Sequence, residues 1–324
     1  MPEITDSTEP TEPLAAIEPS IAASWQSQLE RLPGQYWPKS TLYVVATPIG
    51  NLADLSLRAG YALQLADVIA AEDTRATRVL LQAWGIQTPM LSLHRHNERE
   101  QQAAILQRLA QGERVALVSD AGAPAISDPG GFTVQAVRAA GFDVVALPGA
   151  SAVTTALMSI GSTTDQHPAF CFLGFLPPKS AARQKQLRAW TNFDGTLVWF
   201  EAPHRISAML KDLLTVFGPA RQVSLARELT KRFEQCVTLP LDQVAQWIAA
   251  DRFREQGEYV VLLHPPNDVP ADTEDEVASP VVEAWMDALL AHASTRDAAK
   301  IMAQALGQPK DVCYARLLAR SKHN

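Results

Sequence analysis

The chain is poor in the residues and patterns that define several protein classes. Of its 324 residues only three are cysteines, Cys171, Cys236 and Cys313, and they form no C-x-x-C pair. A disulfide framework or a structural zinc site is therefore not expected, and a reducing, cytoplasmic environment is favoured. No apolar run approaches the roughly 18–20 residues that span a bilayer. The acidic first residues do not resemble a secretory signal or a transit peptide. We expect a cytoplasmic protein with no membrane partner and no bound metal.

The chain also lacks an overall positive charge, since its formal net charge is −7 at pH 7. The acidity is local. Residues 1–40 hold six acidic and two basic side chains, and residues 267–283 hold six acidic side chains and no basic one. Residues 284–324 hold six Lys or Arg against three Asp. The body is therefore close to neutral and the C-terminal segment is basic, which permits a nucleic-acid partner.

Three loops that follow apolar runs consist of small residues, prolines and glycines. The longest is 119–130, Ser-Asp-Ala-Gly-Ala-Pro-Ala-Ile-Ser-Asp-Pro-Gly, and the others are 47–51, Thr-Pro-Ile-Gly-Asn, and 148–151, Pro-Gly-Ala-Ser. Prolines fix the path of such loops before a ligand binds, and the small side chains leave room for one. Turn chemistry alone would explain any single loop. Together they predict one small-ligand crevice at the carboxyl ends of a parallel sheet.

Strand and helix patterns alternate from residue 41 onward, which is typical of βαβ units and a mostly parallel sheet. The runs 223–226 and 233–238 are close enough to form a hairpin, so the second sheet should be mixed. The expected strands are 42–46, 67–71, 90–93, 115–118, 143–147, 170–173, 196–200, 223–226, 233–238 and 259–263.

The same patterns predict the domain organisation. The Pro-, Glu-, Ser- and Thr-rich start predicts a disordered acidic extension over 1–40. Two α/β domains are expected over 41–155 and 156–266. An acidic linker over 267–280 should lead to a small basic helical domain over 281–324, with helices at 281–291, 295–306 and 310–320. Ser294 and Asp297 have the spacing of a capping box at the start of the second of these helices.

Seven motifs occur in the order found in one protein family. They are 47–52 (Thr-Pro-Ile-Gly-Asn-Leu), 72–75 (Glu-Asp-Thr-Arg), 119–130, 147–149 (Leu-Pro-Gly), 174–177 (Gly-Phe-Leu-Pro), 201–205 (Glu-Ala-Pro-His-Arg) and 226–231 (Ala-Arg-Glu-Leu-Thr-Lys). Over residues 41–264 the chain resembles the ribosomal RNA small subunit methyltransferase I family of the tetrapyrrole-methylase superfamily. Its basic tail resembles the small C-terminal domain of that family.

The resemblance implies a fold, a reaction and partners. The implied fold is two α/β domains of the tetrapyrrole-methylase type (class III methyltransferase), with a cofactor cleft between them, plus a small C-terminal helical domain. The implied reaction is S-adenosylmethionine-dependent 2′-O-methylation of a cytidine in the decoding region of 16S rRNA. The implied partners are the 30S subunit that contains this rRNA and a second copy of the chain in a homodimer.

The resemblance also implies which residues surround S-adenosylmethionine. Relatives usually have Thr at the position of Ala123 and Pro at that of Ala150, so a side-chain hydrogen bond worth about 0.5–1.5 kcal/mol is lost here if that Thr contacts the cofactor. Phe175 and Leu176 would face the cofactor from the second domain. The first domain would contribute Ile49, Asp120, Gly122, Ala123, Ile126, Ser151 and Ala152.

Methyl transfer from a sulfonium to a hydroxyl is a direct displacement that needs no metal. In-line orientation can supply about 7–11 kcal/mol, and a general base about 10²–10⁴-fold in rate. Charged residues at strand ends are base candidates, although each could instead cap a helix or form an ion pair. We select Glu228 with Lys231 and Arg227 for deprotonation or phosphate clamping, because the preceding apolar strand should hold them firmly. The other candidates are Glu72, Asp73 and Arg75; His94, His96 and Asn97; and Glu201, His204 and Arg205.

Two basic stretches are candidates for RNA contact. One follows the 174–177 turn and the other lies near the C-terminus. Solvated helix faces are the ordinary explanation for such runs, but phosphate contact is favoured beside an RNA-modifying cleft. The residues selected for RNA binding are Lys179, Arg183, Lys185, Arg205, Arg316 and Arg320.

Three other functions compete with this reading. A small-molecule, tetrapyrrole-type methyltransferase would share the cleft, although such relatives open with a G-x-G-x-G loop where this chain has Thr47-Pro-Ile-Gly50. A nicotinamide oxidoreductase is disfavoured because no G-x-G-x-x-G follows the first strand. A non-catalytic ribosome-binding protein remains an alternative, since Ala123 and Ala150 depart from the family pattern.

Overall fold

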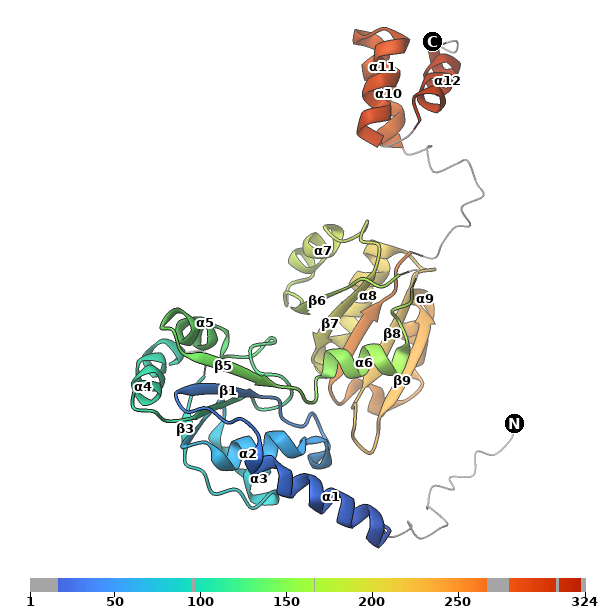
Figure 1. The fold of residues 1–324 in the computed structure, drawn as a ribbon. Coiled ribbons are helices and arrows are strands. Elements are labelled where there is room, and N and C mark those ends of the chain that lie inside the picture. Colours follow the sequence, from blue (N-terminus) through green and yellow to red (C-terminus); the bar gives the residue numbers. More distant parts are fainter. Residues whose placement is uncertain (1–16, 95–96, 166, 267–279, 307–308, 322–324) are drawn as a thin grey trace, which may run out of the picture. The chain divides into compact units, whose positions relative to one another are not determined.

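The computed structural model describes residues 17–94, 97–165, 167–266, 280–306 and 309–321. The chain divides into two compact units, Met1–Pro266 and Asn267–Asn324. The first unit contains two five-stranded sheets with their helices, and the second is helical (Figure 1). The predicted linker lies outside the described residues apart from Pro280, which begins a helix.

The disorder predicted for residues 1–40 is wrong for the described part of this segment. Helix α1 (Pro19–Arg31) is followed by a 3-10 turn, Leu32–Gly34. Pro19 stands at a position where helices tolerate proline, and Ile21, Trp25 and Leu29 have helical spacing that the polar composition conceals. All residues of α1 are exposed or half-buried, so the helix adds little to the core. Residues 1–16 lie outside the described residues.

The first sheet is fully parallel, with strand order β3-β2-β4-β1-β5. Helices α2 and α3 cover one face and α4 and α5 the other, each over a separate apolar core. Because β4, β1 and β5 are neighbours, the three predicted loops lie side by side at their carboxyl ends. The elements are β1 (Thr41–Val45), α2 (Leu57–Leu65), β2 (Val68–Ala71), α3 (Thr74–Ala83), β3 (Met90–Ser92), α4 (Glu98–Ala110), β4 (Val115–Val118), α5 (Gly131–Ala139) and β5 (Asp143–Leu147).

The second sheet is mixed, as predicted, with order β6-β7-β10-β8-β9 and a β8–β9 hairpin. Only β6 and β7 pair in parallel; β10 runs antiparallel to both β7 and β8. Helices α7, α8 and α9 pack on one face. The elements are β6 (Phe170–Phe175), α7 (Ser180–Arg188), β7 (Thr196–Glu201), α8 (Ile206–Phe217), β8 (Gln222–Arg227), β9 (Gln235–Pro240), α9 (Leu241–Ala249) and β10 (Tyr259–Leu263).

Helix α6 (Ala152–Ile160) covers the other face of the second sheet. Val153, Ala156 and Leu157 pack there against residues of β7, β8 and β10. The domain boundary predicted between residues 155 and 156 therefore falls inside a helix. Sequence reasoning missed this helix because the Gly-rich loop and the apolar run after it gave no clear capping signal; Ser151 stands at the cap without a side-chain hydrogen bond.

The second unit is a three-helix cluster of α10 (Pro280–His292), α11 (Thr295–Leu306) and α12 (Lys310–Ser321). These bounds match the predicted helices to within a residue. Ser294 caps α11 as the spacing predicts, since the backbone N–H of Asp297 donates to Ser294 Oγ at 3.2 Å and Ser294 Oγ donates to Asp297 Oδ2 at 2.6 Å. Met286, Ala298, Met302, Cys313 and Leu317 make the buried core. Within the described part of the chain, no helix has the length and apolar character needed to span a membrane.

Candidate functional site

A cavity of about 430 Å³ lies where the loops of the first sheet meet the second sheet. Its volume falls in the range typical of small-ligand sites. Eight of the nine residues predicted to surround the cofactor line it: Ile49, Asp120, Gly122, Ala123, Ile126, Ser151, Ala152 and Phe175. The crevice that the composition of the three loops predicts is therefore present, and residues of all three loops line it.

Two backbone hydrogen bonds fasten the 47–51 loop to the 119–130 loop. Thr47 N donates to Gly122 O, and Gly122 N donates to Thr47 O, both at 2.9 Å. Gly122 has a φ of +75°, and a Cβ there would lie 3.3 Å from Ile49 Cγ2. Glycine therefore meets both the conformation and the space at this crossing.

The 119–130 loop holds two non-glycine residues in the left-handed region, Ala125 with φ of 68° and Ser127 with φ of 66°. Each such residue costs on the order of 1–3 kcal/mol and persists only where its surroundings enforce it. The Ala125 N–H donates to Pro129 O at 3.2 Å, which closes the turn. Strain of this kind clusters at ligand clamps, and here it aims Ile126, Ser127 and Asp128 at the cavity.

The cavity is acidic and partly aromatic. Its lining includes Phe175, Phe200 and Tyr259, and none of the described residues that line it is Lys, Arg or His. The carboxylates in the lining are those of Glu72, Asp120, Asp128, Glu201 and Glu258. Carboxylates and aromatic faces both attract cations, so the cavity suits a positively charged ligand with apolar parts. Among the residues that the structure describes, no group of three or more His, Cys, Asp or Glu is arranged to hold a metal ion.

Leu176 is the one predicted cofactor residue whose side chain does not line the cavity. It is 2% exposed and lies in the core of the second sheet with Leu187 and Trp199. The alternation of strand side chains explains the error, because Phe175 and Leu176 point to opposite faces. Phe175 is 52% exposed and packs edge-on against Phe200 at 5.7 Å between ring centroids.

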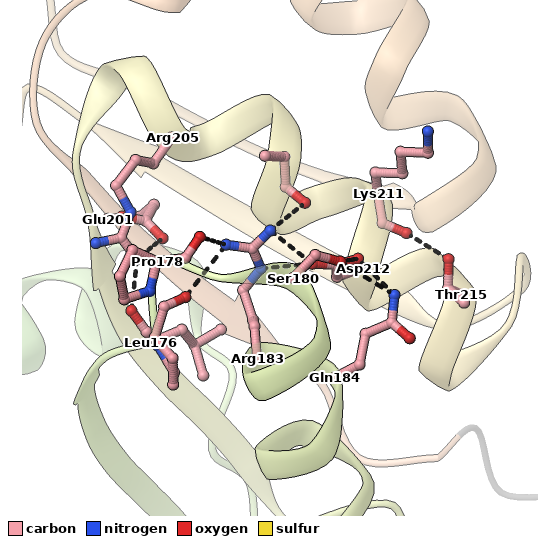
Figure 2. Close-up of polar contacts among 12 residues, drawn as sticks. Leu176, Pro178, Ser180, Arg183, Gln184, Glu201, Arg205, Lys211, Asp212 and Thr215 are labelled. Carbon is pink, nitrogen blue, oxygen red and sulfur yellow. Dashed lines mark hydrogen bonds and ion pairs between the residues drawn. The ribbon is translucent and has the colours of Figure 1, made fainter.

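Arg205, predicted to contact RNA, instead supports the cavity wall. Its guanidinium pairs with Glu201 at 3.0 Å and donates a short hydrogen bond to the carbonyl of Leu176 (Figure 2). The Glu201 side chain is fully buried, so this arginine neutralises a carboxylate that has no access to water. The prediction for Arg205 is therefore corrected: it bridges β7 to the turn that carries Phe175.

Arg183, also predicted to contact RNA, is buried with an exposed fraction of 3%. Its Nε donates to Asp212 Oδ2 at 2.6 Å, and its Nη1 lies 3.3 Å from the carbonyls of Pro177 and Pro178 (Figure 2). The prediction is wrong because Asp212 lies on α8, 29 residues away. No local pattern in α7 indicates that partner.

Asp212 is ionised within this buried network. Burial alone would raise the pKa of Asp212, but hydrogen bonds from Gln184, Ser180 and Arg183 outweigh it and hold the pKa below its ordinary value. Ser180 Oγ donates to Oδ1 at 2.8 Å and Gln184 Nε2 at 2.7 Å. The network fastens α7 to α8 directly behind the 174–178 turn.

Arg227, selected for catalysis, is 6% exposed and bound to backbone carbonyls. Its Nε donates to Gln256 O and its Nη2 to Phe253 O, both at 2.7 Å. These bonds hold the segment that precedes β10. The prediction of a reactive or phosphate-clamping role for Arg227 is therefore wrong, because its donors are already used inside the fold.

Glu228 and Lys231 form an ion pair of 3.0 Å, and Lys231 also binds Glu258 at 2.8 Å. Burial would raise the pKa of Glu228, but the backbone N–H of Glu258 and the Lys231 ammonium lower it overall. The Lys231 pKa is raised, since its two carboxylate partners outweigh burial. Of this cluster only Glu258 lines the cavity. A carboxylate with a lowered pKa accepts protons less readily, which argues against Glu228 as the base.

The remaining base candidates are spread over several environments. Asp73 pairs with Arg75 at 2.7 Å, and hydrogen bonds from Arg75 lower the Asp73 pKa to about 2. The His94 backbone N–H donates to Asn97 Oδ1, while His204 lies in the 3-10 turn Pro203–Arg205. His96 lies outside the described residues.

Sequence reasoning missed Glu258 and Tyr259, which line the cavity from the amino end of β10. Because β10 is antiparallel to β7 and β8, its first residues meet the carboxyl ends of those strands. A search restricted to carboxyl ends of strands passes over them. Burial raises the Tyr259 pKa to about 12, so the phenol stays protonated and donates to Arg254 O.

The other predicted RNA contacts divide into exposed and paired groups. Lys179 and Lys185 are exposed on α7 and its N-cap. In the second unit Arg320 binds Asp287 at 2.6 Å, and Arg316 is half-buried. The structure therefore leaves the α7 lysines exposed, pairs Arg320 with Asp287 and half-buries Arg316.

Comparisons with known proteins agree with this geometry. The family model described as Tetrapyrrole (Corrin/Porphyrin) Methylases matches residues 41–245. The model described as RsmI C-terminal HTH domain matches residues 276–321.

Curated relatives match over most of the chain. A ribosomal RNA small subunit methyltransferase I from Pseudomonas aeruginosa is 42% identical over 280 residues, covering 86% of this chain and 97% of the relative. The protein of the same name from Neisseria meningitidis serogroup B is 44% identical, covering 85% of this chain and 91% of the relative.

Solved structures share the architecture of the first unit. A cobalt precorrin-4 methyltransferase has a TM-score of 0.52 at 17% identity and covers 69% of this chain and 95% of its own. A Thermus thermophilus uroporphyrin-III C-methyltransferase, complexed with S-adenosyl homocysteine, has a TM-score of 0.50 at 20% identity and covers 68% and 96%. At these identities the likeness concerns the fold alone, and the fold class predicted from the sequence is confirmed.

Proposed function

Because this chain belongs to the ribosomal RNA small subunit methyltransferase I family of the tetrapyrrole methylases, we propose that it methylates a cytidine 2′-hydroxyl in the decoding region of 16S rRNA. Its family uses S-adenosylmethionine as the methyl donor. The rRNA substrate, the 30S context and a homodimeric state belong to the proposal.

The acidic, aromatic cavity carries the proposal. S-adenosylmethionine brings a sulfonium and an ammonium together with an apolar adenine, and it supplies an electrophilic methyl group when bound. Asp120, with Glu72 and Asp128 in the same lining, fits the positive charges, and Phe175 with Ile49 and Ile126 fits the apolar part. The backbone groups around Gly122 and Ala123 are free of bulky side chains, so the loss of a Thr at Ala123 leaves their main-chain contacts intact.

The protein's own contribution is to orient the methyl donor and to place charged side chains beside it. The braced loops hold the donor in one orientation, and in-line approach is worth up to about 7–11 kcal/mol. We assign Lys231, kept charged and fixed by Glu228 and Glu258, to hold the RNA backbone beside the cavity. Glu228 then acts on Lys231 rather than on the ribose hydroxyl.

One experiment tests the reaction. Purified protein is incubated with methyl-labelled S-adenosylmethionine and 30S subunits from a strain that lacks this modification, and the methyl group is mapped by mass spectrometry. A label on a cytidine ribose supports the proposal. A label on a base, or on an added uroporphyrinogen-type tetrapyrrole instead of rRNA, contradicts it. Calorimetry with S-adenosylmethionine tests the non-catalytic alternative, for which no heat of binding is expected.

A further inference from the structure

The described part of the second unit carries three exposed cations that sequence reasoning did not select: Arg296, Lys300 and Lys310. Arg296 lies in the first turn of α11 and Lys310 begins α12. Both side chains are exposed, and no hydrogen bond or ion pair engages them among the described residues. Arg320 of the same unit is bound to Asp287. Two of the three exposed positive charges in the described part of this unit therefore lie at the starts of helices.

Arg296 and Lys310 line one shallow hollow together with Asp311 and Tyr314. Tyr314 lies one turn after Lys310 on α12 and is 40% exposed. Below the hollow, α11 and α12 pack through Ala298, Ala299 and Cys313, which are all fully buried. The first turns of two helices, two exposed cationic side chains and an aromatic ring thus line one hollow above a packed core.

This combination matches the chemistry of a single RNA strand. Helix N-termini and cations attract phosphate, and an exposed tyrosine ring offers a face on which an unpaired base can stack. A-form duplex RNA is a poorer fit, because its deep, narrow major groove excludes side chains. The family model for this unit describes a helix-turn-helix domain, a class known for nucleic-acid binding through the start of a helix, although its DNA-binding members read duplex major grooves.

We propose that the hollow formed by Arg296, Lys310, Asp311 and Tyr314 binds a single-stranded segment of the rRNA substrate. The identity of the RNA rests on the proposed function, whereas the binding surface rests on the contacts of the second unit alone. Arg296 and Lys310 hold phosphates, and Tyr314 stacks on a base. Asp311 opposes the bound phosphates and moderates the affinity.

The test measures binding of the full chain to 30S subunits and to 16S rRNA fragments across a range of salt concentrations. In R296A/K310A the slope of log K against log salt should fall by about 1.4, because each phosphate contact to a single strand contributes about 0.7. The matched control K39A/R138A also removes two positive charges. Both positions are exposed and lie near the amino ends of β1 and β5, whereas the cavity lies at the carboxyl ends of the first sheet. Its slope should stay at the wild-type value.

Tyr314 and Asp311 give independent readouts. Tyr314→Ala should weaken binding by about ten-fold, whereas Tyr314→Phe keeps the ring and should bind like wild type. Asp311→Asn should tighten binding by about two-fold or more, since it removes a repulsive charge. Circular dichroism confirms folding of each variant.

The outcomes separate this proposal from the proposed function. If wild type methylates 16S rRNA but R296A/K310A keeps the wild-type slope and Tyr314→Ala the wild-type affinity, the surface is refuted and the methylation stands. If the variants weaken a duplex fragment but not a single strand, the proposal is also overturned. If wild type binds single strands through these residues yet transfers no methyl group to rRNA, the surface stands and the proposed function fails.

Discussion

Helix α7 and the three-helix C-terminal unit are the two basic regions of the chain, and the structure divides each in the same way. In α7, Arg183 is buried against Asp212, while Lys179 and Lys185 are free to meet solvent. In the C-terminal unit Arg320 binds Asp287, while Arg296 and Lys310 are exposed. The two regions differ in burial: the α7 pair is closed to water, whereas the Arg320–Asp287 pair remains partly exposed. A basic stretch thus contains both paired and exposed cations. Whether a cation is paired depends on a carboxylate supplied by another helix.

The largest effect is expected at the buried pair of α7. Arg183→Ala should cost about 3–5 kcal/mol in free energy of unfolding, because it leaves Asp212 as an unpaired buried charge. Urea denaturation of the isolated variant measures this cost. In the matched double variant R183M/D212L no charge remains, so most of the stability should return. A loss below about 1 kcal/mol in Arg183→Ala would show that the pair is open to water.

The same pair gives a pH dependence of known sign. The Asp212 pKa in the folded state lies below its ordinary value of 3.8, so the pair contributes its full stability above that value. This contribution is lost as the pH falls through the lowered folded pKa. Unfolding measured from pH 6 down to pH 2 should therefore show a steeper loss in wild type than in R183M/D212L. Parallel curves would contradict the assignment.

Arg205→Leu should act on ligand binding more than on the RNA. It unpairs the buried Glu201 and frees the Leu176 carbonyl, so the turn that carries Phe175 is no longer fixed against the cavity. We expect affinity for S-adenosylmethionine, measured by calorimetry, to fall by about ten-fold or more. Arg205→Lys keeps the charge and should recover part of it. A normal affinity with a changed salt slope for rRNA would restore the RNA-contact hypothesis for this residue.

The exposed lysines of α7 should show the opposite pattern from Arg183. K179A/K185A should leave the free energy of unfolding within about 0.5 kcal/mol of wild type. The salt slope for 30S binding should fall by about 1–2, since up to two phosphate contacts are removed. An unchanged slope would exclude α7 from the RNA surface and leave the charge of this helix without a role in binding.

The smallest effect is expected at Arg320. Its hydrogen bond lowers the pKa of Asp287, so any stabilisation is present at neutral pH and is lost as the pH falls below the ordinary range of an aspartate. Exposed pairs contribute little, so Arg320→Gln should shift the melting temperature of the second unit only slightly at pH 7 and not at all near pH 2. A large fall in melting temperature at pH 7 would show that the Arg320–Asp287 pair stabilises its unit as strongly as the buried Arg183–Asp212 pair stabilises α7.

Features set by neighbouring residues could be predicted from the sequence, whereas contacts with residues far along the chain could not. The small residues of the loop after β4 predict a ligand crevice by themselves. Asp120, Gly122 and Ile126 of this loop line the cavity, as expected. Arg183 and Arg227 were misassigned because their partners, Asp212 and the carbonyls of Phe253 and Gln256, are set by helix packing and sheet pairing. Those contacts arise only after the chain has folded.

Strand direction accounts for most of the remaining error. Parallel strands place all their functional ends on one edge, which made the first sheet predictable. The antiparallel insertion of β10 between β7 and β8 brings Glu258 and Tyr259 to the same edge from the other end of a strand. Sequence spacing predicted a mixed sheet but did not specify which strand would be inverted.

The path of the backbone between the two sheets has a consequence of its own. After β5 the chain passes once, through 148–151, to α6, which packs on the second sheet, and Ser151 at the end of this crossing lines the cavity. Any rotation of one sheet against the other would therefore change the backbone beside the cavity. If the methyl donor binds there as proposed, it contacts residues on both sides of this crossing, so donor binding would also restrict such a rotation.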